Sequence, residues 1–181
     1  MAEAFSNSLT RAAGIVTTSS AGSIGITTNK ITGISTVSVA VGDLVDNTNY
    51  IAGTKVTGFG NAVDQVIVDR DSTNTSATTS QSVKFLGVTT SYSSPAATKT
   101  ILIGGTFANN TNSQVNLTVE VRDSSAGISV AIASKIPVPA GSSFVIADTG
   151  KTLLEGDDEL HVYCDSAGAI DANLSVLTGV N

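Results

Sequence analysis

Aromatic residues and cysteine are scarce in this chain of 181 residues. Only 4% of the residues are aromatic, tryptophan is absent, and Cys164 is the single cysteine. A lone cysteine excludes an intrachain disulfide, so the fold has to be stable without one, which fits synthesis in a reducing cytoplasm. Sugar-cleaving and sugar-binding clefts usually carry aromatic platforms, and the three tyrosines, Tyr50, Tyr92 and Tyr163, lie far apart in the sequence. The composition therefore disfavours both of these classes.

Charge is also scarce, and it is of the wrong sign for nucleic acid. Charged residues make up 13% of the chain, and the net charge is −6. The nine basic residues are scattered singly from Arg11 to Lys151, whereas contact with a phosphate backbone needs clustered Lys and Arg. No run approaches the roughly 20 apolar residues that span a bilayer, and the first residues lack the features of a signal peptide. We therefore expect no nucleic-acid partner and no membrane partner.

The sequence offers little chemistry for catalysis. His161 is the only histidine and stands three residues before Cys164 in a strand-like run, so their side chains should point to opposite faces. We expect Cys164 to be buried beside Val162, and His161 to share the other face with Tyr163. No phosphate-binding loop, dinucleotide fingerprint or nucleophile elbow is present. The sequence thus predicts no catalytic, cofactor-binding or metal-binding residue and a protein that is not an enzyme.

Two acidic segments invite comparison with calcium sites. Residues 155–159 read Glu-Gly-Asp-Asp-Glu and fit either a Ca²⁺ site or a solvated turn that caps a strand; we favour the turn. Residues 69–74 begin like an EF-hand loop but lack glycine at the sixth position and glutamate at the twelfth. Fifteen acids leave a carboxylate pair for glycoside hydrolysis open by count alone.

What the chain has in abundance is the pattern of β-strands. Residues 115–122 read Val-Asn-Leu-Thr-Val-Glu-Val-Arg, an apolar/polar alternation that predicts a half-buried strand. Similar short runs are separated by Gly, Asn, Asp and Ser turns. Thr and Ser together number 47 residues, and threonine suits the wet face of a strand. The sequence therefore predicts an all-β protein.

We expect two small antiparallel β-sandwich or barrel-like modules and an N-terminal arm. Residues 1–22 are small, polar and weakly patterned, which indicates the arm. Residues 23–90 form the first predicted module. Residues 91–98 contain Pro95 and small residues without a period, which favours a linker. Residues 99–181 show the most regular strands and form the second predicted module, a compact antiparallel sandwich.

The second half also resembles a known class of proteins. Its order of strand, Asn/Thr turn, alternating strand, Pro-x-Pro-x-Gly and Leu-Glu-x-Gly-Asp resembles β-sandwich modules in virion structural proteins of tailed bacteriophages, including marine and cyanobacterial ones. The segments that carry this resemblance are residues 101–111, 115–122, 135–144, 153–160 and 172–177. Residues 31–36 and 41–45 look like segments of phage tail and fibre-associated proteins. The matching residues are turn and core positions, so no site residues transfer.

The resemblance implies a non-enzymatic structural component of a tailed-phage virion. We expect it in the tail, neck or fibre-attachment apparatus, assembled through its N-terminal arm and module surfaces, with a capsid decoration protein as the alternative. A different class, a glycan-binding module of a host-recognition fibre, stays open but lacks an aromatic platform. The implied partners are other virion proteins and copies of the chain itself in a homo-oligomer. The implied location is the virion, after synthesis in the host cytoplasm.

Overall fold

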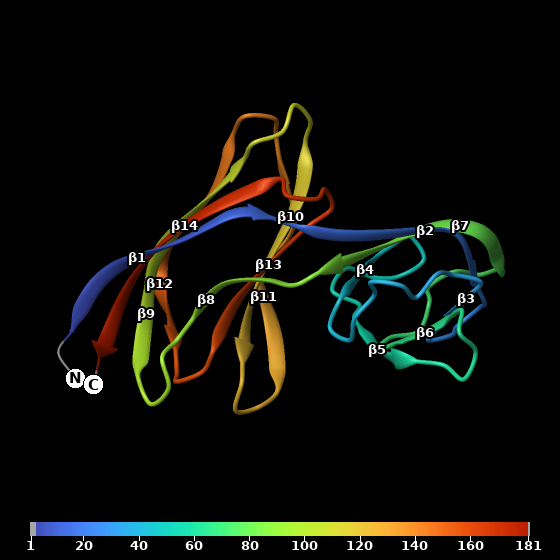
Figure 1. Ribbon diagram of the computed structural model, residues 1–181, viewed down its shortest axis with the longest axis horizontal. Helices are drawn as coiled ribbons and strands as arrows, with labels where there is room; N and C mark the ends of the chain where they lie inside the picture. The colour runs from blue at the N-terminus through green and yellow to red at the C-terminus, as the bar shows by residue number, and fades with distance from the viewer. Residues whose placement is uncertain (1–2, 181) are drawn as a thin grey trace. The chain divides into compact units, whose positions relative to one another are not determined.

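The computed structural model describes residues 3–180, with all of their side chains except those of residues 147–150. The described chain is all-β, as predicted, with fourteen strands and no helix (Figure 1). It divides into two compact units. Unit 1 combines Met1–Gly14 with Thr89–Asn181, and unit 2 consists of Ile15–Val88. Unit 2 is therefore inserted into unit 1 after its first strand.

Unit 1 consists of two four-stranded antiparallel sheets. The first sheet has the order β1 (Ala4–Ala13), β14 (Ile170–Val180), β9 (Lys99–Asn109) and β12 (Ser143–Leu154). The second sheet has the order β11 (Ile128–Val138), β10 (Val115–Asp123), β13 (Glu159–Cys164) and β8 (Thr89–Ser93). Within the unit the first strand pairs with the last, the second with the seventh, the third with the sixth and the fourth with the fifth. This nested pairing is the topology of a jelly roll.

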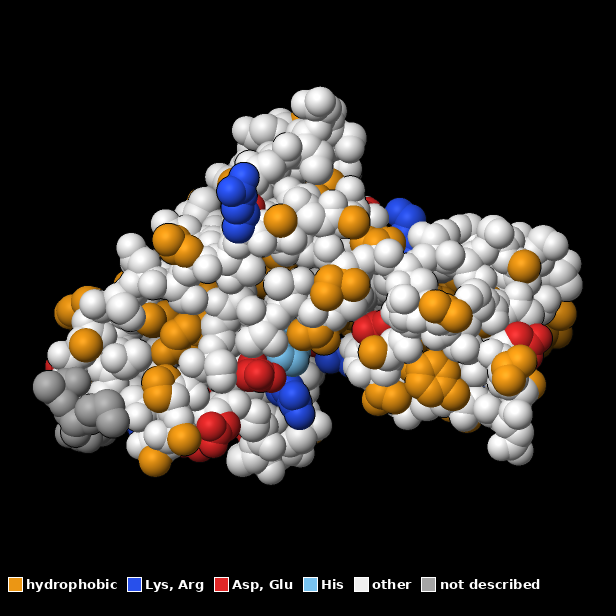
Figure 2. All heavy atoms as spheres, in the orientation of Figure 1, with side chains coloured by type: hydrophobic (Ala, Val, Ile, Leu, Met, Phe, Trp, Pro, Cys, Tyr) orange, Lys and Arg blue, Asp and Glu red, His pale blue; other side chains and the backbone are white. Residues whose placement is uncertain are grey.

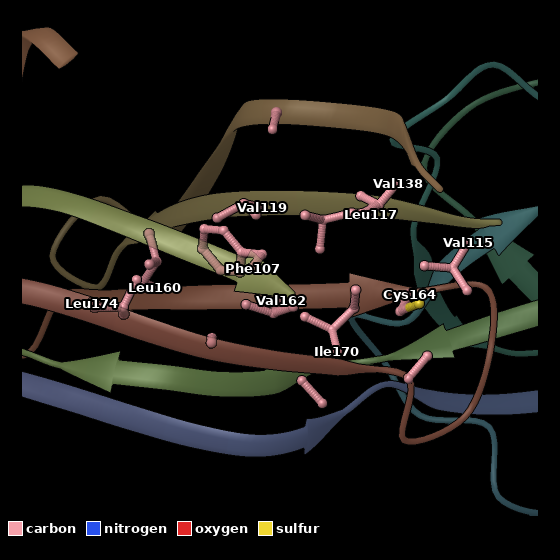
Figure 3. Close-up of a cluster of buried hydrophobic side chains, with 14 of the residues drawn as sticks. Phe107, Val115, Leu117, Val119, Val138, Leu160, Val162, Cys164, Ile170 and Leu174 are labelled. Atoms are coloured by element: carbon pink, nitrogen blue, oxygen red, sulfur yellow. The ribbon is translucent and has the colours of Figure 1, made fainter. Parts of the chain in front are cut away.

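The core of unit 1 is built from the alternating strands that the sequence predicts. In β10 the side chains of Val115, Leu117 and Val119 are at most 1% exposed. They lie beside buried residues of β13 in the same sheet and face residues of β14 and β9, among which Phe107 is the aromatic member of the cluster (Figure 3). Because few aromatic residues are available, Val, Leu, Ile and Ala fill most of the space between the sheets. The predicted strand at residues 115–122 is thus confirmed, but it is not half-buried as expected, because Thr118 and Glu120 on its other face are only 5% and 3% exposed.

Unit 2 is a barrel-like module. Its strands are β2 (Ile15–Ile24), β3 (Lys30–Thr32), β4 (Leu44–Asp46), β5 (Val56–Phe59), β6 (Gln65–Val68) and β7 (Thr78–Gly87). They pair in the order β4-β7-β2-β3-β6-β5. A bridge between Leu44 and Lys55, with a hydrogen bond of 2.8 Å from Val45 N to Thr54 O, joins β4 to the start of β5. The sheet thereby closes on itself around a core that includes Tyr50 and Phe85.

The prediction of an N-terminal arm at residues 1–22 is wrong. Residues 4–13 form β1, which pairs with β14 inside unit 1, and residues 15–24 form β2, the first strand of unit 2. The prediction failed because the two faces of β1 are inverted: its hydroxyl side chains point into the unit and its apolar side chains point outward. Ser8 and Thr10 lie on the inner side, opposite the buried Leu174 and Ala172 of β14, and apolar residues occupy the outer side. Inward hydroxyl groups gave no sign of a buried face.

The prediction of a linker at residues 91–98 is also wrong, and the boundaries between the two modules therefore differ from those predicted. Residues 89–93 form β8, which pairs with β13. The turn that follows is held by buried hydroxyl groups: Ser94 Oγ donates to Thr98 O at 3.0 Å and lies 2.9 Å from Thr100 Oγ1. The units instead meet in the chain at Gly14 and Val88. Satisfied Ser and Thr side chains can line a core, so their abundance does not mark a linker.

Gly14 is the first of these junctions and should tolerate no side chain. Its φ is +123°, and a Cβ atom there would lie 2.5 Å from the carbonyl oxygen of Ser166. We expect Gly14→Ala to lower the free energy of unfolding of unit 1 by about 3 kcal/mol, since strained backbone adds to a clash with main chain. Urea unfolding followed by circular dichroism measures this.

Gly127→Ala is the matched control, because Gly127 also has a positive φ of +68° but has open space where the added methyl group would stand. It should cost only about 1 kcal/mol. Equal losses for the two variants would show that the close approach at Gly14 does not matter.

Candidate functional site

The strand that carries His161 and Cys164 separates the two residues, as predicted. Cys164 is fully buried in the core of unit 1 together with Val162. His161 lies on the other face with Tyr163, and their rings meet edge-on with centroids 6.4 Å apart. A nucleophile–base pair between His161 and Cys164 is therefore excluded by geometry. Among the described residues no three His, Cys, Asp or Glu side chains are grouped to hold a metal ion.

His161 belongs to a short polar chain on the second sheet. Its Nε2 lies 2.9 Å from Glu159 Oε2, and Arg122 donates to the same oxygen at 3.3 Å. The imidazole is 5% exposed, and its Nδ1 is buried without a hydrogen-bond partner. The contacts link β10 to β13, which are neighbours in the sheet. This arrangement ties the two strands together.

The acidic segment at residues 155–159 is the turn that we favoured. The carboxylate of Asp158 accepts hydrogen bonds from Ser124 N at 3.0 Å and from Glu155 N at 2.9 Å, one on each oxygen. Asp158 is only 6% exposed. Both oxygens of this carboxylate thus hold backbone amides of neighbouring turns in place. In the other acidic segment, Asp69 Oδ1 accepts from Lys55 N at 2.8 Å, which joins two stretches of unit 2.

The three tyrosines do not form a binding platform. Tyr50 is 4% exposed in the core of unit 2 and donates to Thr28 O at 3.3 Å. Burial, together with the charge of Asp71, raises the pKa of Tyr50 to about 12. Tyr163 is 1% exposed, and Tyr92 packs against the core of unit 1. Tyr50 and Tyr92 thus pack with the cores of the two units, and Tyr163 is buried beside His161 on the other face of β13.

Asn109 organises one end of the jelly roll. It is 2% exposed, and its Nδ2 lies 2.8 Å from Ser113 O, 2.9 Å from Val138 O and 3.1 Å from Pro139 O. Its Oδ1 accepts from Thr111 N at 2.9 Å and from Thr111 Oγ1 at 2.8 Å. The spacing Asn-x-Thr in a loop is typical of such an Asx turn, but only the fold brings the β11 end within reach.

The loops around Asn109 enclose an open polar hollow of about 380 Å³. Its lining contains neither a charged nor an aromatic side chain: Ala108, Asn109, Asn110, Thr111, Asn112, Gly141, Ser142 and Ser143. Amide and hydroxyl groups of this kind can exchange hydrogen bonds with a neutral polar ligand. The lining holds no His, Asp, Glu, Lys or Cys side chain that could serve as a base to activate its hydroxyl groups.

The most unusual surface is the outer side of the first sheet. Large apolar side chains stand there on all four strands, and we call them the apolar face: Phe5, Leu9, Ile101, Ile103, Val145, Leu153 and Leu177. Phe5, Leu177, Ile101 and Leu153 are paired in one row that crosses the whole sheet. Phe5 is 78% exposed and Leu9 is 75% exposed.

Such a face is unusual because the wet side of an antiparallel sheet is normally polar. Here the hydroxyl groups of β1 point inward instead, where Ser8 Oγ donates to the carbonyl oxygen of Ser91 at 2.9 Å. None of the residues of the apolar face carries a charge, and neither do Asn7, Asn173 and Ser175 between them. Figure 2 shows hydrophobic side chains over the region where Figure 1 places β1, β14 and β9. Exposed apolar patches of this kind mark interaction surfaces.

The chain matches no family model, and searches among curated proteins and among solved structures find no similar protein. Within residues 3–180 there is no helix with the length and apolar character needed to cross a membrane. The fold, the apolar face and the polar hollow are therefore the features from which a function has to be argued.

The hydrogen bonds of Asn109 lead to a direct prediction. Asn109→Ala should lower the free energy of unfolding by about 3 kcal/mol, because it leaves several buried backbone groups without partners. Asn112→Ala is the control, since Asn112 lines the same hollow but is exposed, and it should change stability by less than about 0.5 kcal/mol. Urea unfolding of both variants checks this. Two equally stable variants would mean that the Asn109 network contributes nothing.

Proposed function

We propose that this chain is a non-enzymatic structural component of a tailed-phage virion that assembles through the surfaces of its β-modules. The observation that carries the proposal is the uncharged apolar face on the outer side of the first sheet. A catalytic site needs convergent reactive groups, whereas an assembly surface needs flat area that gains from leaving water. The apolar face fits the second requirement.

The topology of unit 1 supports the same proposal. Eight-stranded jelly rolls occur in viral capsid proteins, in lectins and in cupins. A fold by itself does not define a function, so this likeness only adds weight to the resemblance carried by residues 101–177. The two arguments are independent, because the resemblance rests on turn and core residues and the topology rests on strand pairing.

Within the virion, the tail, neck or fibre-attachment apparatus is our preferred location, and capsid decoration is the alternative. Two units with separate cores suit an adaptor, since each can hold a different neighbour. The proposed assembly does not use a separate N-terminal arm, because β1 is part of the first sheet. The partners proposed are other virion proteins and copies of the chain itself, met after synthesis in the host cytoplasm.

Purified particles test the proposal. Peptides of this chain should be present in tailed particles isolated on a density gradient, at a constant ratio to the other particle proteins. Gold-labelled antibody should then bind at the tail or neck, because we assign the chain to that apparatus; labelling over the head would favour decoration instead. Recovery of the chain only in the soluble fraction of the lysate, never in particles, would rule out a virion role.

A glycan-binding role is the second candidate, and the polar hollow around Asn109 is the observation that favours it. Jelly rolls serve as lectins, and the lining of Asn, Ser and Thr side chains offers hydrogen bonds to sugar hydroxyls. A glycan array probed with the purified chain should then give hits that the exposed substitution Asn112→Ala weakens. An array without hits, or hits that are unchanged in this variant, would argue against the hollow as a sugar site.

A further inference from the structure

The apolar face combines protruding side chains with hollows. Phe5 and Leu9 are the most exposed of its members and stand four residues apart on β1, or about 13 Å along the strand. Beside them lie two hollows over β14. One, of about 390 Å³, is lined by Phe5, Asn7, Ile103 and Ser175 among others. The other, of about 430 Å³, is lined by Leu9, Thr106, Asp171 and Asn173 among others.

The spacing of the hollows matches the spacing of the side chains. The floor of the first hollow includes Ser175 and Val176, and that of the second includes Asp171, Ala172 and Asn173. The midpoints of these two β14 stretches are three to four positions apart, which corresponds to about 10–14 Å. Small residues on β14 thus form recesses at the same interval at which large residues protrude from β1. A surface with both features is self-complementary, as a two-fold interface requires.

We propose that the apolar face is a dimer interface in which a second copy of this chain packs its own apolar face, related by a two-fold axis. The row of Phe5, Leu177, Ile101 and Leu153 of each copy then packs against the same row of the other. The inference deepens the proposed structural role and rests on it for its biological meaning.

Charge favours a second copy as the occupant. The chain carries a net charge of −6, so most faces of two copies repel each other. The seven residues of the apolar face carry no charge. Around them stand Arg11 and Asp171, which line its hollows, and the exposed Lys151, two residues from Leu153 on β12. A second copy therefore meets few charges here, and they are not all of one sign.

The available area suits a dimer of modest affinity. Four strands at about 4.8 Å spacing, with about seven residues each of about 3.4 Å, present roughly 450 Å² per copy. Two copies bury roughly 900 Å² if the surface is treated as flat. Protruding side chains raise the buried area to near the roughly 1,000 Å² that a specific interface needs. We therefore expect dimerisation that depends on protein concentration.

The full-length chain tests this by light scattering on a sizing column over a range of concentrations. The wild type should shift from monomer to dimer. Phe5→Glu should weaken the dimer at least about 30-fold, because aromatic residues at interface centres contribute most to binding. Leu153→Glu, on the opposite edge strand of the same sheet, should also weaken the dimer. Circular dichroism verifies that both variants are folded.

Val130→Glu is the matched control. Val130 is 61% exposed on β11 of the second sheet, and the substitution adds the same charge, so the dimer should persist. A monomer at every concentration, or a dimer weakened by Val130→Glu and not by Phe5→Glu or Leu153→Glu, would overturn the inference. These readouts use the purified chain alone, so a failed dimer leaves the particle experiment standing, and absence from particles leaves the dimer standing.

Discussion

The pairing of the first strand with the last is the contact on which the rest of the molecule depends. β1 pairs with β14 from Ala4 opposite Thr178 to Ala13 opposite Ile170. It completes the first sheet, closes the nested set of strand pairs and brings Gly14 against residues 164–168. Because unit 2 follows directly after Gly14, the same pairing also determines where the inserted module leaves the jelly roll. The contact spans almost the whole sequence, so it is costly in loop entropy until the other pairs have formed.

Hydroxyl and amide groups replace aromatic residues in much of the interior. Ser94, Thr98, Thr100 and Asn109 are all at most 4% exposed. Each finds partners in the backbone or in another side chain, which is the condition for burying polar groups without loss of stability. The stability of such a core depends more on the positions of its hydrogen-bond partners than on the apolar area that it buries, since one misplaced partner leaves a buried polar group unsatisfied.

The inversion of β1 links this interior to the surface. Its hydroxyl groups turn inward to reach the β8 backbone, so its apolar residues turn outward and add Phe5 and Leu9 to a sheet that already exposes Val145 and Leu153. Water contact with such a face is unfavourable, which is why we assign assembly to it. The structural role and the dimer thus derive from the same local feature of the fold.

The fold class and the alternation of most strands could be predicted from the residues alone, because side chains on β-strands have a period of two that local pattern reveals. The same pattern predicted that Cys164 and His161 face apart and that Asp158 lies in a turn. The folded chain was needed to show that residues 4–13 belong to the same sheet as residues 170–180, that residues 91–98 are not a linker and that Asn109 ties three segments together. Those features depend on partners up to about 170 residues distant, and no local pattern encodes which strand a given strand will meet.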